Sequence, residues 1–237
     1  MPITQTSATG SGVTVTTATT GTSITVAAGD KITVWVGTDA SARTVTSVVF
    51  NSGAQNLTFV GAQNQSSTAR CEQWEITAPS AGTGTVTVNV NTAGIYAFAA
   101  VVTSGAATGA GYRDVIVKIA ANSNTPSLTI TSEVNDLAIA GLAIKNTSSA
   151  FTADGSPVST VANVASGTGA SHVRLVVLAE TGAASTSPSG TIAAARDWAM
   201  VGTNINIAPA ASGGIVLDRR RRAEAAIYIM RMFGVIP

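Results

Sequence analysis

The stretch Thr85-Val86-Thr87-Val88-Asn89-Val90 alternates strictly between polar and apolar side chains. Its three valines fall on one side and its two threonines and asparagine on the other, which is the pattern of a β-strand with one buried face. Residues 32–36 repeat the alternation, and the shorter runs 13–15 and 24–26 do the same. The building unit of this chain is therefore predicted to be a strand with one apolar face.

Similar runs rich in Val, Ile and Thr recur between clusters of Gly, Ser, Asn and Pro. We expect further strands at 44–50, 57–60, 72–77, 95–102, 115–119, 127–131, 137–144, 173–179 and 198–207. No amphipathic helical stretch separates these runs before residue 218, which argues against parallel βαβ units. The predicted fold is all-β: an antiparallel β-sandwich, jelly-roll-like, with a short C-terminal helix or docking segment.

The composition divides the chain into four parts. Residues 1–11 are small and polar and predict a flexible N-terminal arm, followed by the β-sandwich over 12–207. The Gly/Ala/Thr-rich stretch 104–111 is either a linker between two halves or a long loop across one sandwich. We favour the loop, because neither half alone shows a complete set of strands. We expect residues 208–217 to be a linker and residues 218–237 to be a C-terminal docking segment.

Composition also limits the chemistry. Apolar residues make up 45% of the chain and charged residues only 11%, and 13 basic residues nearly balance 12 acidic ones. The only cysteine, Cys71, has no partner for an intrachain disulfide, and the only histidine, His172, has no evident companions for a metal site. No apolar run is long enough for a transmembrane helix. We therefore expect no enzyme, no cofactor and no bound metal.

Aromatic and acidic residues receive structural interpretations. We expect Trp35, Trp74 and Trp198 in the core or covering a sheet. Glu72 and Glu75 lie three residues apart on a predicted strand, so their carboxylates point to opposite faces and cannot act as a catalytic pair.

The C-terminal segment differs in kind from the rest of the chain. Its 20 residues hold five arginines and two acids, a net charge of +3, whereas the other 217 residues hold 8 basic and 10 acidic groups, a net charge of −2. An apolar run follows the arginines and is compatible with a helix capped by Asp218 or with an edge strand. The candidate protein-docking residues are Arg219, Arg220, Arg221, Arg222, Ile227, Tyr228, Met230 and Phe233.

Three interpretations of this segment remain open. It packs on its own sandwich, it docks the subunit onto a larger assembly, or its arginines contact nucleic acid. Four adjacent arginines at the start of a helix oppose the helix dipole, so a carboxylate-rich neighbour would favour the docking interpretation. The body offers no basic surface and no aromatic stacking pattern that would extend a nucleic-acid contact.

Several short motifs resemble those of a known family in their order. Gly29-Asp30 precedes the strand at 32–36, Asn135-Asp136 precedes the run at 137–144, and Asp197-Trp198-Ala199 opens the last predicted strand. This order resembles the jelly-roll-like β-sandwich domain that recurs in tailed-phage virion proteins and bacterial surface proteins. The resemblance implies an interaction or display module without a common catalytic site.

Together these observations predict a non-enzymatic structural protein of a tailed-phage virion, namely a capsid decoration (cement) subunit. By analogy with that class, we expect a homo-oligomer, a trimer, that contacts other virion proteins such as the major capsid protein. The alternative is a tail-fibre or adhesin-like receptor- or glycan-binding module. In that case loops 62–67 and 181–190 would carry the contact, beside an exposed Trp or Tyr on one rim.

Overall fold

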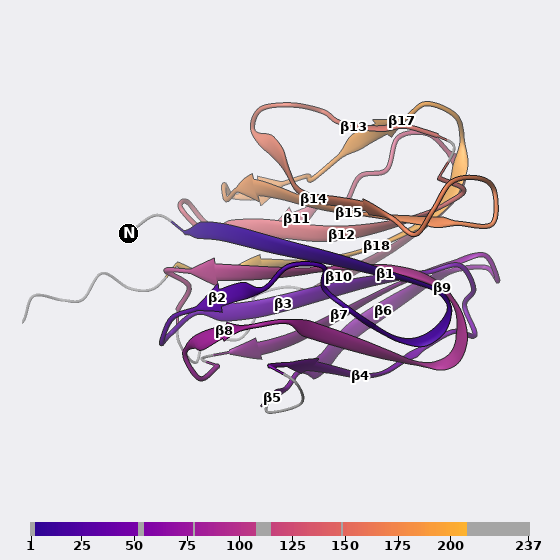
Figure 1. Cartoon of the computed structure of the whole chain (residues 1–237). Coiled ribbons are helices and arrows are strands. Elements are labelled where there is room, and N and C mark those ends of the chain that lie inside the picture. Colours follow the sequence, from indigo (N-terminus) through magenta and orange to yellow (C-terminus); the bar gives the residue numbers. More distant parts are fainter. Residues whose placement is uncertain (1–2, 52–54, 78, 108–114, 148, 208–237) are drawn as a thin grey trace, which may run out of the picture.

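The computed structural model describes residues 3–51, 55–77, 79–107, 115–147 and 149–207, with the backbone alone over 115–122. Over these residues the secondary structure consists of strands, all paired antiparallel, which confirms the predicted all-β sandwich (Figure 1). The first half of the chain contains β1 (Thr4–Thr19), β2 (Ile24–Val26), β3 (Lys31–Thr38), β4 (Val45–Phe50), β5 (Gln55–Asn56), β6 (Thr58–Gln65), β7 (Ala69–Thr77), β8 (Gly82–Gly84) and β9 (Val86–Ser104). The second half contains β10 (Val115–Ser123), β11 (Ile130–Thr131), β12 (Leu137–Lys145), β13 (Phe151–Ala153), β14 (Val158–Ala165), β15 (Val173–Thr181), β16 (Ser185–Thr186), β17 (Gly190–Ile192) and β18 (Arg196–Ile205).

The larger sheet is built entirely from the first half of the chain and curls on itself. Its long strand β9 pairs with β4 near its start and with β3 near its end, while β1 follows the other edge of β9 along most of its length. The curl encloses a first apolar core that includes Val34, Phe50, Val88 and Phe98. The alternating stretch that begins at Thr85 thus lies at the centre of this sheet, with its valines buried inside the curl.

The second half of the chain forms the other sheet, with strand order β10-β18-β12-β15-β14. One face of this sheet packs on the larger sheet. The opposite face is covered by two small ladders, β11 with β16 and β13 with β17, over an apolar core around Leu142, Leu178 and Trp198.

A third core lies between the two sheets and holds the sandwich together. Trp35 and Cys71 of the larger sheet meet Ile139, Leu175 and Val201 of the smaller one, all of them buried. At one margin of the sandwich β1 lies against β14, where the hydroxyl of Ser7 donates to a carbonyl of β14 (2.9 Å), and at the other margin β6 lies against β10. Figure 1 shows the resulting stack of layers, with β13 and β17 outermost on one side.

Both halves of the chain use the same strand order. Across the sandwich the larger sheet runs β1-β9-β3-β7-β6, and the smaller sheet runs β10-β18-β12-β15-β14. In each half the first strand pairs with the last, and the last pairs with the strand that follows a Gly-Asp or Asn-Asp turn. Each half thus forms a complete sheet, contrary to the expectation that neither half has a complete set of strands, and residues 108–111 of the stretch 104–111 lie outside the described residues.

The predicted flexible arm is wrong from residue 4 onward. Residues 4–12 pair with β9 as the first part of β1, and Ala8 is buried in the first core. The small residues serve close packing: a Cβ atom on Gly10 would lie 2.4 Å from the Phe98 ring, and one on Gly12 would lie 2.6 Å from the Tyr96 ring. Glycine in a strand commonly marks such a close approach. Composition alone suggested mobility because the aromatic rings come from a distant strand.

Candidate docking end of the sandwich

The two ends of the described chain meet at one end of the sandwich, which we call the terminal end. Here β1 begins, β9 and β18 finish, and β3 and β12 start. Ala106 and Ile207 form an isolated β-bridge, and the amide of Ala107 donates to the carbonyl of Asn206 (2.9 Å). The last described residue, Ile207, therefore lies at the terminal end, and the linker that leads to the C-terminal segment begins there.

The carboxylate of Asp136 fixes the position of Ile207 at the end of the described chain. This buried carboxylate accepts hydrogen bonds from the side-chain amide of Asn204 (3.0 Å), the backbone amide of Ile207 (3.0 Å) and the backbone amide of Glu133 (3.3 Å). The turn just before β12 presents this carboxylate, and Asn135 adopts a φ of 71° within it. Asn tolerates this left-handed conformation better than most residues. The Asn-Asp pair noted in the sequence thus serves as a turn and an anchor for the end of β18.

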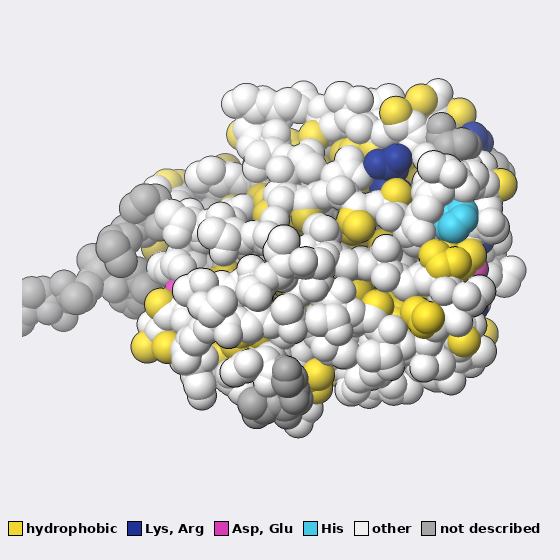
Figure 2. Space-filling view, viewed as in Figure 1, with side chains coloured by type: hydrophobic (Ala, Val, Ile, Leu, Met, Phe, Trp, Pro, Cys, Tyr) yellow, Lys and Arg dark blue, Asp and Glu magenta, His cyan; other side chains and the backbone are white. Residues whose placement is uncertain are grey.

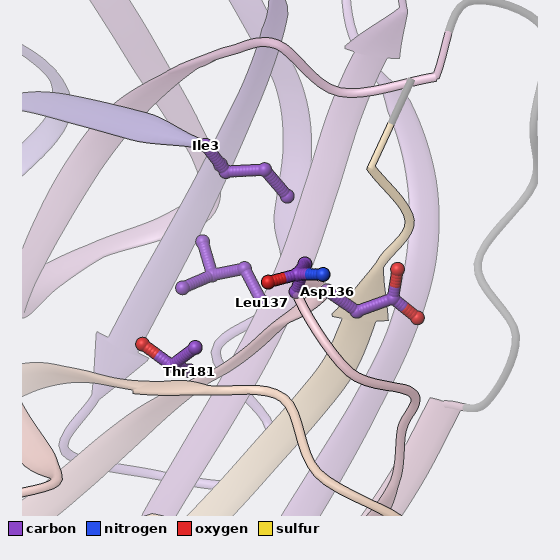
Figure 3. A pocket seen from close by; sticks show the side chains of 5 residues that line it. Ile3, Asp136, Leu137 and Thr181 are labelled. Carbon is purple, nitrogen blue, oxygen red and sulfur yellow. The ribbon is translucent and has the colours of Figure 1, made fainter. Parts of the chain in front are cut away.

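A small cavity of about 100 Å³ opens beside this anchor. It is lined by Ile3, Asn135, Asp136, Leu137 and Thr181. In Figure 3 the side chains of Ile3, Leu137 and Thr181 face one another, while the carboxylate of Asp136 points away from them. Typical small-molecule sites have volumes of roughly 300–1,000 Å³, so this hollow fits one inserted side chain better than a metabolite.

Charge is distributed unequally between the two ends of the sandwich. Leaving aside Asp154, in the covering layer before β14, and Lys118, in the middle of β10, the described residues at the terminal end include five carboxylates and one amine: Asp30, Glu75, Glu133, Asp136 and Glu180 against Lys31. The opposite end, which we call the basic end, has five cations against three carboxylates: Arg43, Arg70, Lys145, Arg174 and Arg196 against Asp39, Glu72 and Asp197. Figure 2 shows Lys, Arg and His side chains gathered on the side away from the start of β1. The terminal end is therefore the more attractive of the two for a cationic segment.

One charged pair of the terminal end is largely enclosed. Lys31 lies in the first position of β3 with its side chain almost fully buried, and its Nζ is 3.8 Å from a carboxylate oxygen of Glu75. Burial lowers the pKa of Lys31, while the negative charge of Glu75 partly offsets that effect. The pair places two charged groups inside the margin of the sandwich, where the loss of their hydration costs free energy.

The residues with catalytic potential serve structural roles. Cys71 is fully buried, and burial raises the pKa of its thiol to about 12, which keeps it protonated and unreactive at neutral pH. The carboxylate of Glu72 accepts hydrogen bonds from the amide of Val45 (3.0 Å), Nε of Arg70 (2.6 Å) and the indole of Trp74 (3.1 Å). Glu75 points to the opposite face of β7, as the spacing predicted, so the two carboxylates do not face each other.

The three tryptophans and the single histidine differ in their burial. Trp35, Trp74 and Trp198 are buried as predicted. His172 is half-buried next to the hydroxyl of Ser166, 3.3 Å from its Nδ1. The described part of the chain contains no group of three or more His, Cys, Asp or Glu residues that could hold a metal ion. The same part contains no helix long and apolar enough to cross a membrane.

The loops suggested for glycan contact are shorter than expected. Residues 62–65 belong to β6 and turn tightly into β7, and the stretch 181–190 contains β16 and the first residue of β17. The predicted rim aromatic is also not found among the described residues, because Tyr96 is buried along with the three tryptophans. Phe59, 48% exposed, is the largest exposed aromatic ring in that part of the chain, and it rests edge-on against Trp74.

The predicted docking residues lie outside the described part of the chain. This holds for Arg219, Arg220, Arg221, Arg222, Ile227, Tyr228, Met230 and Phe233, as well as for the linker 208–217. What the structure adds is the place where the linker to them begins, the anchor at Asp136 and the acidic surroundings of that place. In the sequence Asn135-Asp136 stands out only as a motif, because two of the three donors that Asp136 satisfies, Asn204 and Ile207, lie about 70 residues further along the chain.

Comparison with known protein families, with curated proteins and with solved structures found no match to this chain.

Proposed function

We propose that this protein is a non-enzymatic structural subunit of a virion, a capsid decoration protein that attaches through its C-terminal segment. The observation that carries the proposal is the position of Ile207 at the acidic end of a closed β-sandwich, where the linker to a segment with net charge +3 begins. The resemblance of the strand-opening motifs to a sandwich domain of tailed-phage virion proteins supports the same assignment.

The architecture suits a passive, durable role. Three stacked cores bury the tryptophans and the thiol, and both margins of the sandwich are covered by packing between the sheets. Covered margins protect a β-protein from uncontrolled edge-to-edge association in a crowded particle. The potentially reactive groups Cys71 and Glu72 are occupied by packing and hydrogen bonds, which leaves assembly as the function best supported.

The arginines and the apolar run would have different tasks in attachment. Arg219 to Arg222 would be attracted by carboxylates of a neighbour, including the terminal end of another copy in a homo-oligomer. Ile227, Tyr228, Met230 and Phe233 would then supply the buried apolar area that makes the contact stable. A cationic approach followed by apolar burial predicts association that is fast at low salt and retained at high salt.

Particles reconstituted without this subunit provide the test. Full-length protein should bind to them, and a variant lacking residues 218–237 should remain folded and fail to bind. A matched variant with Arg219 to Arg222 replaced by Gln should bind more slowly, with a reduced salt dependence. Cryo-electron microscopy should place regular density on the capsid lattice. Undiminished binding by the truncated protein, or absence of the protein from purified particles, would contradict the proposal.

A further inference from the structure

We propose that the two halves of this chain are copies of one sheet unit, paired about a pseudo-two-fold axis. Their contact surfaces have become complementary, so that each half packs well against the other half and poorly against a second copy of itself. The interaction surface is the inter-sheet core, and its partner is the opposite half of the chain. This inference is independent of the proposed function.

The turns that open the two central strands match in detail. In the first half the amide of Ala27 donates to the Asp30 carboxylate (2.7 Å) and the amide of Asp30 donates back to the carbonyl of Ala27 (3.2 Å). In the second half Glu133 and Asp136 exchange the same two bonds, at 3.3 Å and 3.1 Å. The residue before each aspartate has a positive φ, 88° at Gly29 and 71° at Asn135. β3 and β12 therefore begin equivalently, with Asp30 matching Asp136.

An irregularity of the edge strands matches too. In the first half a β-bulge in β6 interrupts the pairing with β7 between the partners of Trp74 and Gln73. In the second half a β-bulge in β14 interrupts the pairing with β15 between the partners of Leu178 and Val177. Trp74 pairs with Val34 in β3, and Leu178 pairs with Ala140 in β12, which are equivalent positions when Asp30 matches Asp136. Because bulges are features of a specific fold rather than random defects, a shared position indicates a shared unit.

Equivalent residues of β3 and β12 touch each other across the sandwich, which locates the axis. Trp35 lies on Gly141, where a Cβ atom would be 2.2 Å from the indole, and Gly37 lies on Ala143, where a Cβ atom would be 2.9 Å from the Ala143 Cβ. Further along, Lys145 Nζ is 3.8 Å from the carboxylate of Asp39. Each of these three contacts joins one position to its own equivalent in the other half. The axis consequently runs along the strands between the two sheets.

The residues on the axis differ in complementary ways. A symmetric pairing of two first halves would set Trp35 against a second indole and Asp39 against a second carboxylate. A symmetric pairing of two second halves would leave an empty space at Gly141 and place two Lys145 amines together. Steric overlap, cavities and like charges all disfavour those pairings, whereas the observed pairing avoids them. The axis contacts thus specify association between unlike halves.

Reciprocal exchange at the axis tests the inference in the full-length chain. Trp35→Gly and Gly141→Trp should each lower the midpoint of thermal unfolding by about 10 °C or more, through a cavity and through overpacking. The double variant W35G/G141W should regain at least half of the summed loss. In the native protein the Trp35 indole donates to the carbonyl of Val201 (3.1 Å), and the equivalent carbonyl for the exchanged indole is that of Ala99.

A matched control and a milder exchange keep the result interpretable. W35G/G202W moves the indole to another buried strand glycine, which faces Leu128 and Ile130 and is not equivalent to Trp35, so it should regain nothing. G37A/A143G exchanges a single methyl group, so its unfolding midpoint can be measured even where the tryptophan variants do not fold. Here G37A alone should lower the midpoint and the double variant should restore it. Losses that simply add in both exchanges would overturn the inference.

Discussion

The carboxylate of Asp136 offers a direct test of how the terminal end is held together. Replacing Asp136 by Ala removes the acceptor of three hydrogen bonds, from Asn204, Ile207 and Glu133. Asn204 is fully buried, so leaving one of its amide hydrogens without this acceptor costs roughly 1–3 kcal/mol, and each of the two backbone bonds contributes about 1 kcal/mol. We expect the free energy of unfolding to fall by about 3–5 kcal/mol, which for a chain of this size lowers the Tm by roughly 10 °C.

The equivalent turn in the first half provides the control. The Asp30 carboxylate accepts a hydrogen bond from the amide of Ala27, so Asp30→Ala should cost only about 1 kcal/mol and lower the Tm by roughly 3 °C. Urea and thermal unfolding of both variants measure the difference, and hydrogen exchange at the Ile207 amide reports on the anchor itself. Equal losses in the two variants, or an Ile207 amide as protected in Asp136→Ala as in the native protein, would refute the role assigned to Asp136.

Three further predictions concern the body of the sandwich. Cys71 should resist thiol reagents at pH 8 in the native protein and react fully in denaturant. Because the pKa of its thiol rises from 9.0 in the unfolded chain to about 12 in the folded protein, its contribution to stability is complete below pH 9 and decreases by about 1.4 kcal/mol per pH unit between pH 9 and 12. Cys71→Ala should abolish this decrease in unfolding curves measured at alkaline pH. Glu72→Leu should destabilise the protein by about 3–5 kcal/mol, because it leaves the half-buried guanidinium of Arg70 and the buried indole of Trp74 without their carboxylate. Chemical denaturation measures this loss, which would be smaller if water replaced the carboxylate. Phe59→Ser should change the free energy of unfolding by no more than about 1 kcal/mol, since half of that ring is exposed, and a larger loss in the same assay would show that its edge contact with Trp74 matters more than its exposure suggests.

Local pattern was a good guide to the strands and to the buried residues on them. The alternation at Thr85–Val90 predicted a half-buried strand, and the valines of β9 are buried accordingly. The weakly patterned strand β14 was not predicted, because Ser159, Thr160 and Asn163 interrupt its apolar face. The candidate docking residues were chosen from charge and apolar content alone and remain a prediction, since they lie outside the described residues.

Everything that depends on pairing between distant segments had to come from the three-dimensional structure. A period of two tells which face of a strand is buried and leaves open which other strand will cover it. Gly10 was therefore assigned to a flexible arm and Gly141 to an ordinary strand position, although Phe98 and Trp35 lie directly on them. The matching order of the two sheets was hidden for the same reason: the halves share hydrogen-bond register and turn geometry, while their side chains have diverged to fill one common core.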